Sequence, residues 1–376
     1  MHLLFTRFPL ESADGGAENQ TSWLMEGLRA RGHILQYVGS CPVLLQRARE
    51  LKIENSTLNI GPPPVTKFGA ISFLWRKIAM KRALMRAIEA LPEKPEAIFM
   101  LSLTEKLLLS EWVASKGIRV FWIEHDRIGP WLRWNPWLRS LKRAAQHATI
   151  VCVSEVSRKL YLKMGFDPKK VIAIPNGVPI PGERIAGSDK RLENYPLPTT
   201  HYPLHVGTVA RLDPEKGIDV LIQSIEKLPE VTLSILGKGR LEGYIRTLIE
   251  EDTKRMGQQR IHLLPRVPDL PEFYRSLDLF VLPSSDHDPF GLVAAEAMVL
   301  GVPTIVTDAC GISGHVKNGE DALIVSAGSP QELGIAIKKL FDEEKRSKLS
   351  LAGIQAIRGR LGVPHMIEQY EEVLQK

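Results

Sequence analysis

Two cations follow a predicted buried strand in the second half of the chain. The apolar run Leu204–Val209 is the predicted strand, and Arg211 and Lys216 come just after it, where a helix is expected to begin. A diphosphate leaving group gains negative charge as its bond breaks, and fixed cations at a helix N-terminus stabilise that charge. The pair therefore predicts a diphosphate site. The alternative is that both residues are solvated surface cations.

Two carboxylates lie in the segment Pro283–Met298, which follows the apolar run Leu279–Leu282. Asp288 belongs to the expected turn, whereas Glu296 belongs to an alanine-rich helix. A carboxylate among alanine and methionine side chains costs free energy unless it is hydrogen-bonded. We therefore expect Glu296 to accept hydrogen bonds, for instance from vicinal hydroxyls. The alternative is that it caps a neighbouring backbone group.

A glycine pair, Gly15 and Gly16, follows the first predicted strand and opens a helix. Glycines there let the backbone approach a ligand closely, and the helix N-terminus offers unpaired N–H groups to an anion. This pattern predicts a binding turn for an anion. A plain tight turn explains it equally well.

The elements that hold these residues follow from the alternation of short apolar runs with longer segments of helical period. Continuous apolar strands separated by helices indicate parallel sheets that are covered on both faces. Ligands of such sheets bind beyond the carboxyl ends of the strands. The sequence therefore predicts an α/β protein with two Rossmann-like, doubly wound domains that face each other across a cleft. The strands are predicted at His2–Phe8, Ile34–Gly39, Thr57–Ile60, Ala97–Leu101, Val120–Glu124, Thr149–Val153, Val171–Ile174, His205–Val209, Thr232–Leu236, His262–Leu264, Leu279–Leu282, Thr304–Val306 and Ala322–Val325.

The two predicted domains are separated by a segment rich in proline and glycine. The first domain is expected over residues 1–178 and the second over residues 204–361, with a linker at 179–203 that shows little periodicity. Such composition is typical of a connection rather than of a packed element.

Composition and charge limit the class of partner. Of the 376 residues 44% are apolar and 24% are charged, which is typical of a soluble globular protein of about two domains. The first 200 residues hold 29 Lys and Arg against 18 Asp and Glu. This half is therefore expected to meet an anionic partner, either membrane lipid or a phosphorylated substrate. No nucleic-acid-binding motif is present, so nucleic acid is not expected.

A cytoplasmic location is predicted from three features. The three cysteines are far apart, the N-terminus lacks the pattern of a signal peptide, and no apolar run approaches the ~20 residues that span a bilayer. The segment Phe68–Leu91 adds an expectation of peripheral membrane contact, because it combines cations with apolar residues such as Phe73 and Trp75. The alternative is an ordinary domain helix. Trp131, Trp134 and Trp137 form a second candidate patch that lines a cleft or only packs.

No metal or cofactor is predicted. Asp286-His287-Asp288 matches the sequence pattern of a metal-binding motif that occurs in a different fold. A metal is not expected here, because two cations already provide positive charge for the expected phosphates. Gly237-Lys238-Gly239 follows a strand, yet the spacing of the next glycine does not fit a dinucleotide fingerprint.

Taken together, these motifs resemble the GT4 family of GT-B glycosyltransferases, which transfer a sugar from a nucleotide diphosphate with retention at the anomeric carbon. The resemblance covers nearly the whole chain. The residues that carry it are Gly15-Gly16, Arg31-Gly32-His33, Ile174–Val178, Gly207 with Ala210–Leu212 and Lys216-Gly217, Leu236-Gly237 with Gly239, and Asp288–Leu292 with Glu296–Met298.

The resemblance implies roles for the residues singled out above. Arg211 and Lys216 would bind the diphosphate and act as the main catalytic groups, and Glu296 would bind the ribose. The family has glutamate where this chain has Asp288, so the side chain of the catalytic carboxylate is one methylene shorter. The resemblance therefore leaves the identity of the donor sugar undetermined. Further donor contacts are implied for Gly15, Gly16 and the backbone of Phe290, Gly291 and Leu292.

The resemblance also implies a role for His125, which follows the strand Val120–Glu124. The family has a histidine near the donor sugar here, and the carboxyl end of a strand is a favourable place for a ligand contact. His125 is therefore a candidate sugar or acceptor contact with a catalytic role, although a lone histidine is more often structural. By the same resemblance, residues 1–178 bind the acceptor, residues 204–361 bind the donor, and a helix within 362–376 packs back on the first domain.

The predicted reaction is the transfer of a hexose from a UDP- or GDP-linked sugar to a hydroxyl of a saccharide or lipid-linked acceptor, with retention and without a metal. Such a reaction would serve cell-surface glycan biosynthesis. Two alternatives remain open. One is a sugar-nucleotide epimerase or hydrolase on the same scaffold, because a fold does not fix a reaction. The other is a non-catalytic nucleotide-sugar binding protein, in which Asp288 would be the first sign of lost activity.

Overall fold

A computed structural model describes residues 1–10, 15–125, 132, 134–182 and 203–376. These residues form two compact units, each of which has its own parallel sheet. The N-terminal unit contains Met1–Pro175 and Met366–Lys376, and the C-terminal unit contains 176–182 and 203–365. Most of the predicted linker, at residues 183–202, lies outside the described part of the chain.

The N-terminal unit is built on a seven-stranded sheet in the order β3-β2-β1-β4-β5-β6-β7, and its described strand pairs are parallel. Because β1 lies between β2 and β4, the chain direction across the sheet reverses there, as it does in doubly wound folds. The strands are β1 (His2–Arg7), β2 (Ile34–Gly39), β3 (Glu54–Thr57), β4 (Ala97–Met100), β5 (Arg119–Glu124), β6 (Thr149–Cys152) and β7 (Val171–Ala173). The helices are α1 (Gly16–Ala30), α2 (Pro42–Glu50), α3 (Lys67–Glu89), α4 (Leu103–Ser115), α6 (Leu138–Ala145) and α7 (Glu155–Lys163).

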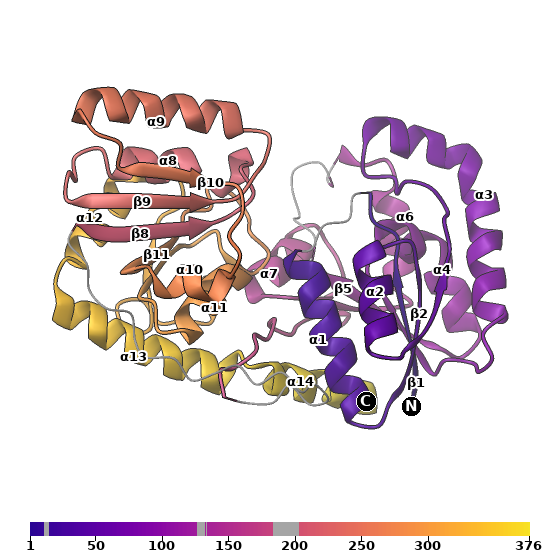
Figure 1. Cartoon of the computed structure of the whole chain (residues 1–376). Coiled ribbons are helices and arrows are strands. Elements are labelled where there is room, and N and C mark those ends of the chain that lie inside the picture. Colours follow the sequence, from indigo (N-terminus) through magenta and orange to yellow (C-terminus); the bar gives the residue numbers. More distant parts are fainter. Residues whose placement is uncertain (11–14, 126–131, 133, 183–202) are drawn as a thin grey trace. The chain divides into compact units, whose positions relative to one another are not determined.

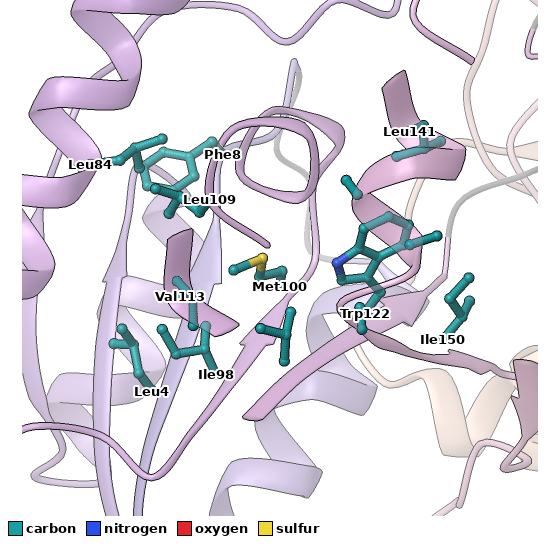
Figure 2. Packing of buried hydrophobic residues seen from close by; sticks show 14 of the residues in the cluster. Leu4, Phe8, Leu84, Ile98, Met100, Leu109, Val113, Trp122, Leu141 and Ile150 are labelled. Atoms are coloured by element: carbon teal, nitrogen blue, oxygen red, sulfur yellow. The ribbon is translucent and has the colours of Figure 1, made fainter. Parts of the chain in front are cut away.

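Side chains on neighbouring residues of a strand point to opposite faces of this sheet, so both faces are apolar. Leu4, Ile98 and Trp122 lie in the cluster that α3, α4 and α6 cover, as Figure 2 shows. On the other face the rings of Phe5 and Phe99 stack with their centroids 4.7 Å apart. This burial on both sides explains why the strands are continuous apolar runs in the sequence.

Two N-terminal elements differ from the sequence prediction. A strand was expected at Thr57–Ile60, but β3 lies at Glu54–Thr57, where it pairs with β2. This prediction was wrong because β3 carries polar, largely exposed side chains, whereas Leu58 and Ile60 pack on the core beyond the strand. Helix α2 was not predicted at all. It begins at Pro42, a residue well suited to the first helical position.

The C-terminal unit is built on a six-stranded sheet in the order β10-β9-β8-β11-β12-β13, again with parallel pairs. Helices α8, α9 and α12 lie on one face, and α11 packs against α13 (Figure 1). The strands are β8 (Leu204–Val209), β9 (Val231–Leu236), β10 (Ile261–Leu264), β11 (Leu279–Leu282), β12 (Thr304–Thr307) and β13 (Leu323–Val325). The helical segments are η1 (Pro214–Lys216), α8 (Ile218–Ser224), α9 (Glu242–Met256), α10 (Leu270–Arg275), α11 (Leu292–Val299), η2 (Gly311–Gly314), α12 (Pro330–Lys339), α13 (Glu343–Arg360) and α14 (Val363–Gln375). The predicted fold class of two doubly wound parallel sheets is thereby confirmed.

A buried ion pair ties together several elements of the C-terminal unit. The guanidinium of Arg260 donates to both carboxylate oxygens of Asp252 on α9, at 2.8 and 2.9 Å. Its remaining N–H groups donate to the carbonyl oxygens of Ile225 at 3.0 Å and Leu228 at 2.7 Å. Both side chains are almost fully buried, at 3% and 2% exposure. One arginine thus satisfies polar groups from α9 and from the turn after α8.

The last helix, α14, begins in the C-terminal unit and ends in the N-terminal unit. From Met366 onward its residues belong to the N-terminal unit. There the ring of Tyr370 packs against Phe99 of β4 with the centroids 6.0 Å apart, and the amide of Gln20 on α1 donates to Met366. Gly27 of α1 makes room for Ile367, since a β-carbon at Gly27 would lie 2.5 Å from that side chain.

Candidate active site

The sheet order of the C-terminal unit brings two turns together. Strands β8 and β11 are neighbours at the point where the strand order reverses, so the turns after their carboxyl ends lie side by side. The backbone N–H of Ser285, after β11, donates to the carbonyl of Glu215, after β8, at 2.9 Å. Gly217 allows this contact, because it has a φ of +62° and a β-carbon there would lie 2.1 Å from the Pro283 carbonyl oxygen. This is the place where doubly wound sheets bind ligands.

Lys216 and Asp288 meet at this junction. The Lys216 ammonium donates to Asp288 Oδ2 at 2.6 Å, and the Ser284 hydroxyl donates to the same oxygen at 3.1 Å. The Asp288 side chain is 8% exposed and that of Lys216 is 19% exposed. Burial alone would raise the pKa of the Asp288 carboxyl, but Lys216 and Ser284 hold it below its ordinary value. The structure thus joins two predicted site residues from separate turns.

Arg211 belongs to the same turn as Lys216 but faces solvent. Its side chain is 70% exposed, and its guanidinium lies 3.2 Å from Asp213 Oδ2. The turn differs from its prediction, because Lys216 ends the short helix η1 rather than opening a helix, and α8 begins after Gly217.

A third cation, Arg240, joins this group and was missed in the sequence. Its Nε donates to Asp213 Oδ1 at 3.0 Å, so Asp213 holds Arg211 and Arg240 together. Arg240 follows Gly239 in the turn after β9, the strand next to β8. A β-carbon at Gly239 would lie 2.6 Å from the Leu212 backbone, so only a glycine lets these two turns approach. Adjacent glycine and arginine after a neighbouring strand was the signal that could have identified Arg240.

The N-terminus of α11 supplies backbone donors to the same face. Gly291 is its N-cap with a φ of +92°, and a glycine has no side chain that could accept from the first turn of the helix. Phe290 is buried, and its carbonyl accepts from the Ile312 backbone at 2.6 Å, which fixes the approach to the helix. Leu292 begins the helix. An anion is favoured at such a helix start.

Glu296 lies one turn further along α11 and is half-buried. The hydroxyl of Tyr274, on α10, donates to its Oε2 at 2.9 Å. Burial raises the pKa of the Glu296 carboxyl, although the Tyr274 hydrogen bond opposes the change. The carboxylate is thus oriented by a tyrosine, a partner that the sequence did not predict.

Gly15, Gly16 and His125 lie in the N-terminal unit, whereas the other predicted site residues lie in the C-terminal unit. Gly15 is the N-cap of α1 and Gly16 is the first residue of this helix. Glu18 in the first turn of α1 pairs with Arg7 at the end of β1 over 2.9 Å, and both side chains are buried. This buried carboxylate already complements the positive end of the helix dipole.

His125 follows β5 and is half-buried. Burial and the charges of Arg7 and Lys106 hold the pKa of its imidazole well below the ordinary value. Its Nε2 lies 3.5 Å from the Thr21 hydroxyl, which donates its hydrogen to the Ala17 carbonyl. The side chain is therefore a neutral hydrogen-bonding group at neutral pH.

In the N-terminal unit, the buried Glu105 predicts a pH dependence of stability. Its Oε1 accepts from the Ser102 backbone at 2.6 Å in a capping box, and burial raises the pKa of its carboxyl to about 7. Because this pKa is higher in the folded than in the unfolded chain, the associated stability is present below about pH 4.5 and is lost as pH rises through about 7. Glu105→Gln keeps the cap and removes the ionisation, so relative to wild type it should gain about 3 kcal/mol of unfolding free energy between pH 4.5 and 8.

Denaturant titrations at several pH values measure this difference. Glu111→Gln is the matched control, because Glu111 is exposed on the same helix. Parallel pH profiles for wild type and Glu105→Gln would show that Glu105 does not titrate as described.

The residues of the possible metal motif Asp286-His287-Asp288 do not converge on one site in the structure. Asp288 is bound to Lys216, and Asp286 is exposed. Over the residues that the structure describes, no group of three or more His, Cys, Asp or Glu side chains could hold a metal ion. None of the described helices is long and apolar enough to cross a membrane.

Two family models match the chain, one in each half. Residues 14–180 match "Glycosyltransferase Family 4" and residues 199–355 match "Glycosyl transferases group 1". Together they cover most of both units and include every predicted site residue.

Curated relatives that match parts of the chain are named as glycosyltransferases or as a sugar-phosphate synthase. A mannosylfructose-phosphate synthase of Agrobacterium fabrum is 35% identical over 162 residues, which are 40% of this chain and 36% of the relative. A D-inositol 3-phosphate glycosyltransferase of Rhodococcus jostii is 33% identical over 207 residues, or 51% of this chain and 44% of the relative. A capsular polysaccharide biosynthesis glycosyltransferase, CapM of Staphylococcus aureus, is 31% identical over 174 residues, or 45% of each chain. The matched stretches thus span about half the length of these relatives or less.

Among solved structures, HepE of Anabaena, determined in complex with UDP, superposes with a TM-score of 0.79 at 20% identity and covers 100% of both chains. The same protein has been determined with UDP-glucose. At this identity the likeness shows the fold. From its two family matches, its paired parallel sheets and this structural likeness, the chain belongs to the GT4 family of GT-B glycosyltransferases.

Proposed function

We propose that this protein is a retaining glycosyltransferase that moves a hexose from a UDP-linked sugar to a hydroxyl of a saccharide or lipid-linked acceptor. The observation that carries the proposal is the junction of the turns after β8 and β11, where Arg211 and Lys216 share one edge of the sheet with the start of α11. Cations and unpaired N–H groups together suit a diphosphate. UDP is favoured over GDP because HepE, which has the same fold, was solved with UDP.

In the proposed mechanism the diphosphate is the leaving group. Negative charge develops on its β-phosphate oxygens as the anomeric bond breaks, and Arg211 and Lys216 stabilise this charge more strongly in the transition state than in the ground state. The backbone N–H groups of Gly291 and Leu292 contribute in the same way. The acceptor hydroxyl attacks on the face that the diphosphate leaves, and a phosphate oxygen takes the hydroxyl proton. The configuration at the anomeric carbon is then retained.

The remaining site residues orient the donor. Tyr274 engages Oε2 of Glu296 and fixes the carboxylate, so that Oε1 is directed to accept from a ribose hydroxyl. His125 is proposed to hydrogen-bond the sugar or the acceptor through Nδ1, because its imidazole is neutral and its Nε2 faces Thr21. Gly15 and Gly16 give the donor a close approach to the backbone at the start of α1.

Analysis of the reaction products tests this function. The protein is incubated with UDP-hexoses and a panel of saccharide and lipid-linked acceptors, and NMR identifies the anomeric configuration of the product. An α-linked product from an α-linked donor, formed only with acceptor, is expected. Epimerised sugar nucleotide or rapid release of free sugar without acceptor would instead indicate an epimerase or hydrolase. Donor binding without turnover on any acceptor would indicate a binding protein.

An anionic membrane surface is proposed as a further partner, through the outer face of α3. Exposed apolar residues recur along this face at helical spacing, and exposed cations continue it. The apolar residues are Phe68, Ile71, Leu74, Trp75 and Ile78, with exposures between 50% and 80%, and the cations that follow are Arg82 and Arg86. An aromatic-rich face beside cations has the composition of a helix that lies on anionic lipid.

Trp137, one of the three tryptophans that follow β5, packs against the same helix. The Trp137 indole N–H donates to the Ala70 carbonyl at 3.0 Å, and its ring meets Phe73 with the centroids 5.0 Å apart. Trp134 is 85% exposed, whereas Trp131 lies outside the described residues. Phe73 was expected on the apolar surface, but this prediction was wrong because it faces the core at 1% exposure. The inner face of α3 therefore belongs to the core, and the exposed apolar residues lie on its outer face.

Vesicle sedimentation tests the membrane surface. Trp75→Glu should lower partitioning onto phosphatidylglycerol-containing vesicles at least tenfold, since burying one large apolar side chain contributes roughly 1.5–3 kcal/mol. Ile335→Glu is the matched control, because Ile335 is 70% exposed on α12 of the other unit. Equal partitioning of both variants and wild type would contradict the proposed surface. Binding of the wild type to neutral vesicles but not to anionic vesicles would also contradict it.

A further inference from the structure

One oxygen of the Asp288 carboxylate has two donors from this chain. Oδ2 accepts from Lys216 at 2.6 Å and from Ser284 at 3.1 Å. The side chain is 8% exposed. Oδ2 of this carboxylate is therefore engaged within the protein, although the sequence pattern assigned the residue to the catalytic group.

The backbone of Asp288 is held as firmly as its side chain. Its N–H donates to the Ala309 carbonyl at 3.0 Å, and its carbonyl accepts from the Gly311 N–H at 2.9 Å. These bonds form a parallel bridge to Cys310. With the main chain fixed in this way, the Asp288 carboxylate is presented to Lys216 from a defined position.

We propose that Asp288 is the built-in counter-ion of Lys216, a positioning residue that holds the ammonium at the diphosphate site. The inference rests on the proposed function, because it takes a nucleotide diphosphate as the ligand of Lys216. Asp288 uses one donor of the ammonium, and the 19% exposure of Lys216 leaves the group accessible to a phosphate oxygen.

The proposal has a consequence for charge that a sugar contact would not have. Lys216 and Asp288 together are neutral, so loss of Lys216 leaves a buried carboxylate without its cation beside the diphosphate. A buried charge that loses its partner is strongly unfavourable, and it also repels an anionic ligand. Much of the affinity lost in a Lys216 variant would therefore come from Asp288, and neutralising Asp288 should restore it.

Binding of UDP, which carries no sugar, tests the proposal by calorimetry. Lys216→Met should weaken UDP binding about 100-fold, and adding Asp288→Asn to it should recover at least tenfold, or ~1.4 kcal/mol. Asp288→Asn alone loses the positioning of the ammonium but keeps its charge, so it should weaken UDP binding less than Lys216→Met does. If the double variant does not fold, as its melting profile would show, Lys216→Gln with Asp288→Asn replaces it in the same comparison.

Asp286→Asn supplies the matched control, because Asp286 is an exposed carboxylate two positions away in the same turn. Combined with Lys216→Met, it should change UDP affinity less than twofold. A double variant at 216 and 288 that binds no better than Lys216→Met alone would overturn the proposal. So would an Asp288→Asn variant that loses affinity for the UDP-sugar but keeps its affinity for UDP, because that result assigns Asp288 to the sugar. Failure of wild type to bind any nucleotide would instead reject the proposed function.

Discussion

Replacing either Arg211 or Lys216 with alanine should lower the rate of glycosyl transfer by roughly 10²–10³-fold, the scale observed when one preorganised electrostatic donor is removed. Both cations are expected to act on charge that appears as the diphosphate leaves. The loss should therefore appear in kcat, and the KM for the donor should also rise because the same cations bind the diphosphate before the reaction. Steady-state assays of UDP release at varied donor concentration separate the two parameters.

Arg246→Ala is the control for these variants. Arg246 is an exposed arginine on α9, and it pairs only with Glu242 on its own helix among the described residues. Its loss should leave transfer within about twofold of wild type, since an exposed pair of this kind contributes little. Near-normal transfer by both Arg211→Ala and Lys216→Ala would show that the diphosphate is not stabilised where the account places it.

The largest loss of stability is expected from Arg260→Ala, which should lower the unfolding free energy by about 3–5 kcal/mol. The substitution removes the buried cation from the Asp252 carboxylate, which keeps the partly exposed Arg255, and it removes one donor each from the Ile225 and Leu228 carbonyls. Removing one partner of a buried ion pair has a cost of this size. Chemical denaturation that is followed by a probe in the C-terminal unit measures it.

Arg255→Ala provides a matched comparison at the same carboxylate. Arg255 also pairs with Asp252, but its side chain is 42% exposed. Its loss should lower the unfolding free energy by less than ~1 kcal/mol. Equal destabilisation by the two variants would mean that burial of the Arg260 pair does not set its contribution.

Strands that are buried on both faces could be predicted from the sequence because burial leaves continuous apolar runs. The predicted run Leu279–Leu282 coincides with β11, and Ile34–Gly39 coincides with β2. Strand β3 and helix α2 lie at the edge of the sheet and left no such run. At an edge, the pairing partner rather than the hydropathy decides where the strand forms.

Site residues could be predicted from the sequence where their types and spacing within one short segment indicate a function. Arg211, Lys216 and Glu296 were each identified from a single segment of sequence. The partners that position Lys216 and Glu296, however, lie elsewhere in the chain. Lys216 meets Asp288 from a position 72 residues distant, and Glu296 meets Tyr274 from a position 22 residues distant. Contacts of this kind follow from the strand order, which a single sequence does not contain. The counter-ion role of Asp288 therefore emerged only from the structure.

The direct test of the central claim is a thermal-shift measurement with UDP, GDP, ADP and CMP on wild type and Arg211→Ala. A ligand that binds only the folded state raises the Tm by mass action. We expect UDP to raise the Tm of wild type selectively, and we expect Arg211→Ala to lose that increase. No shift of the wild-type protein with any of the four nucleotides would contradict the assignment of a nucleotide-diphosphate site to the turns after β8 and β11.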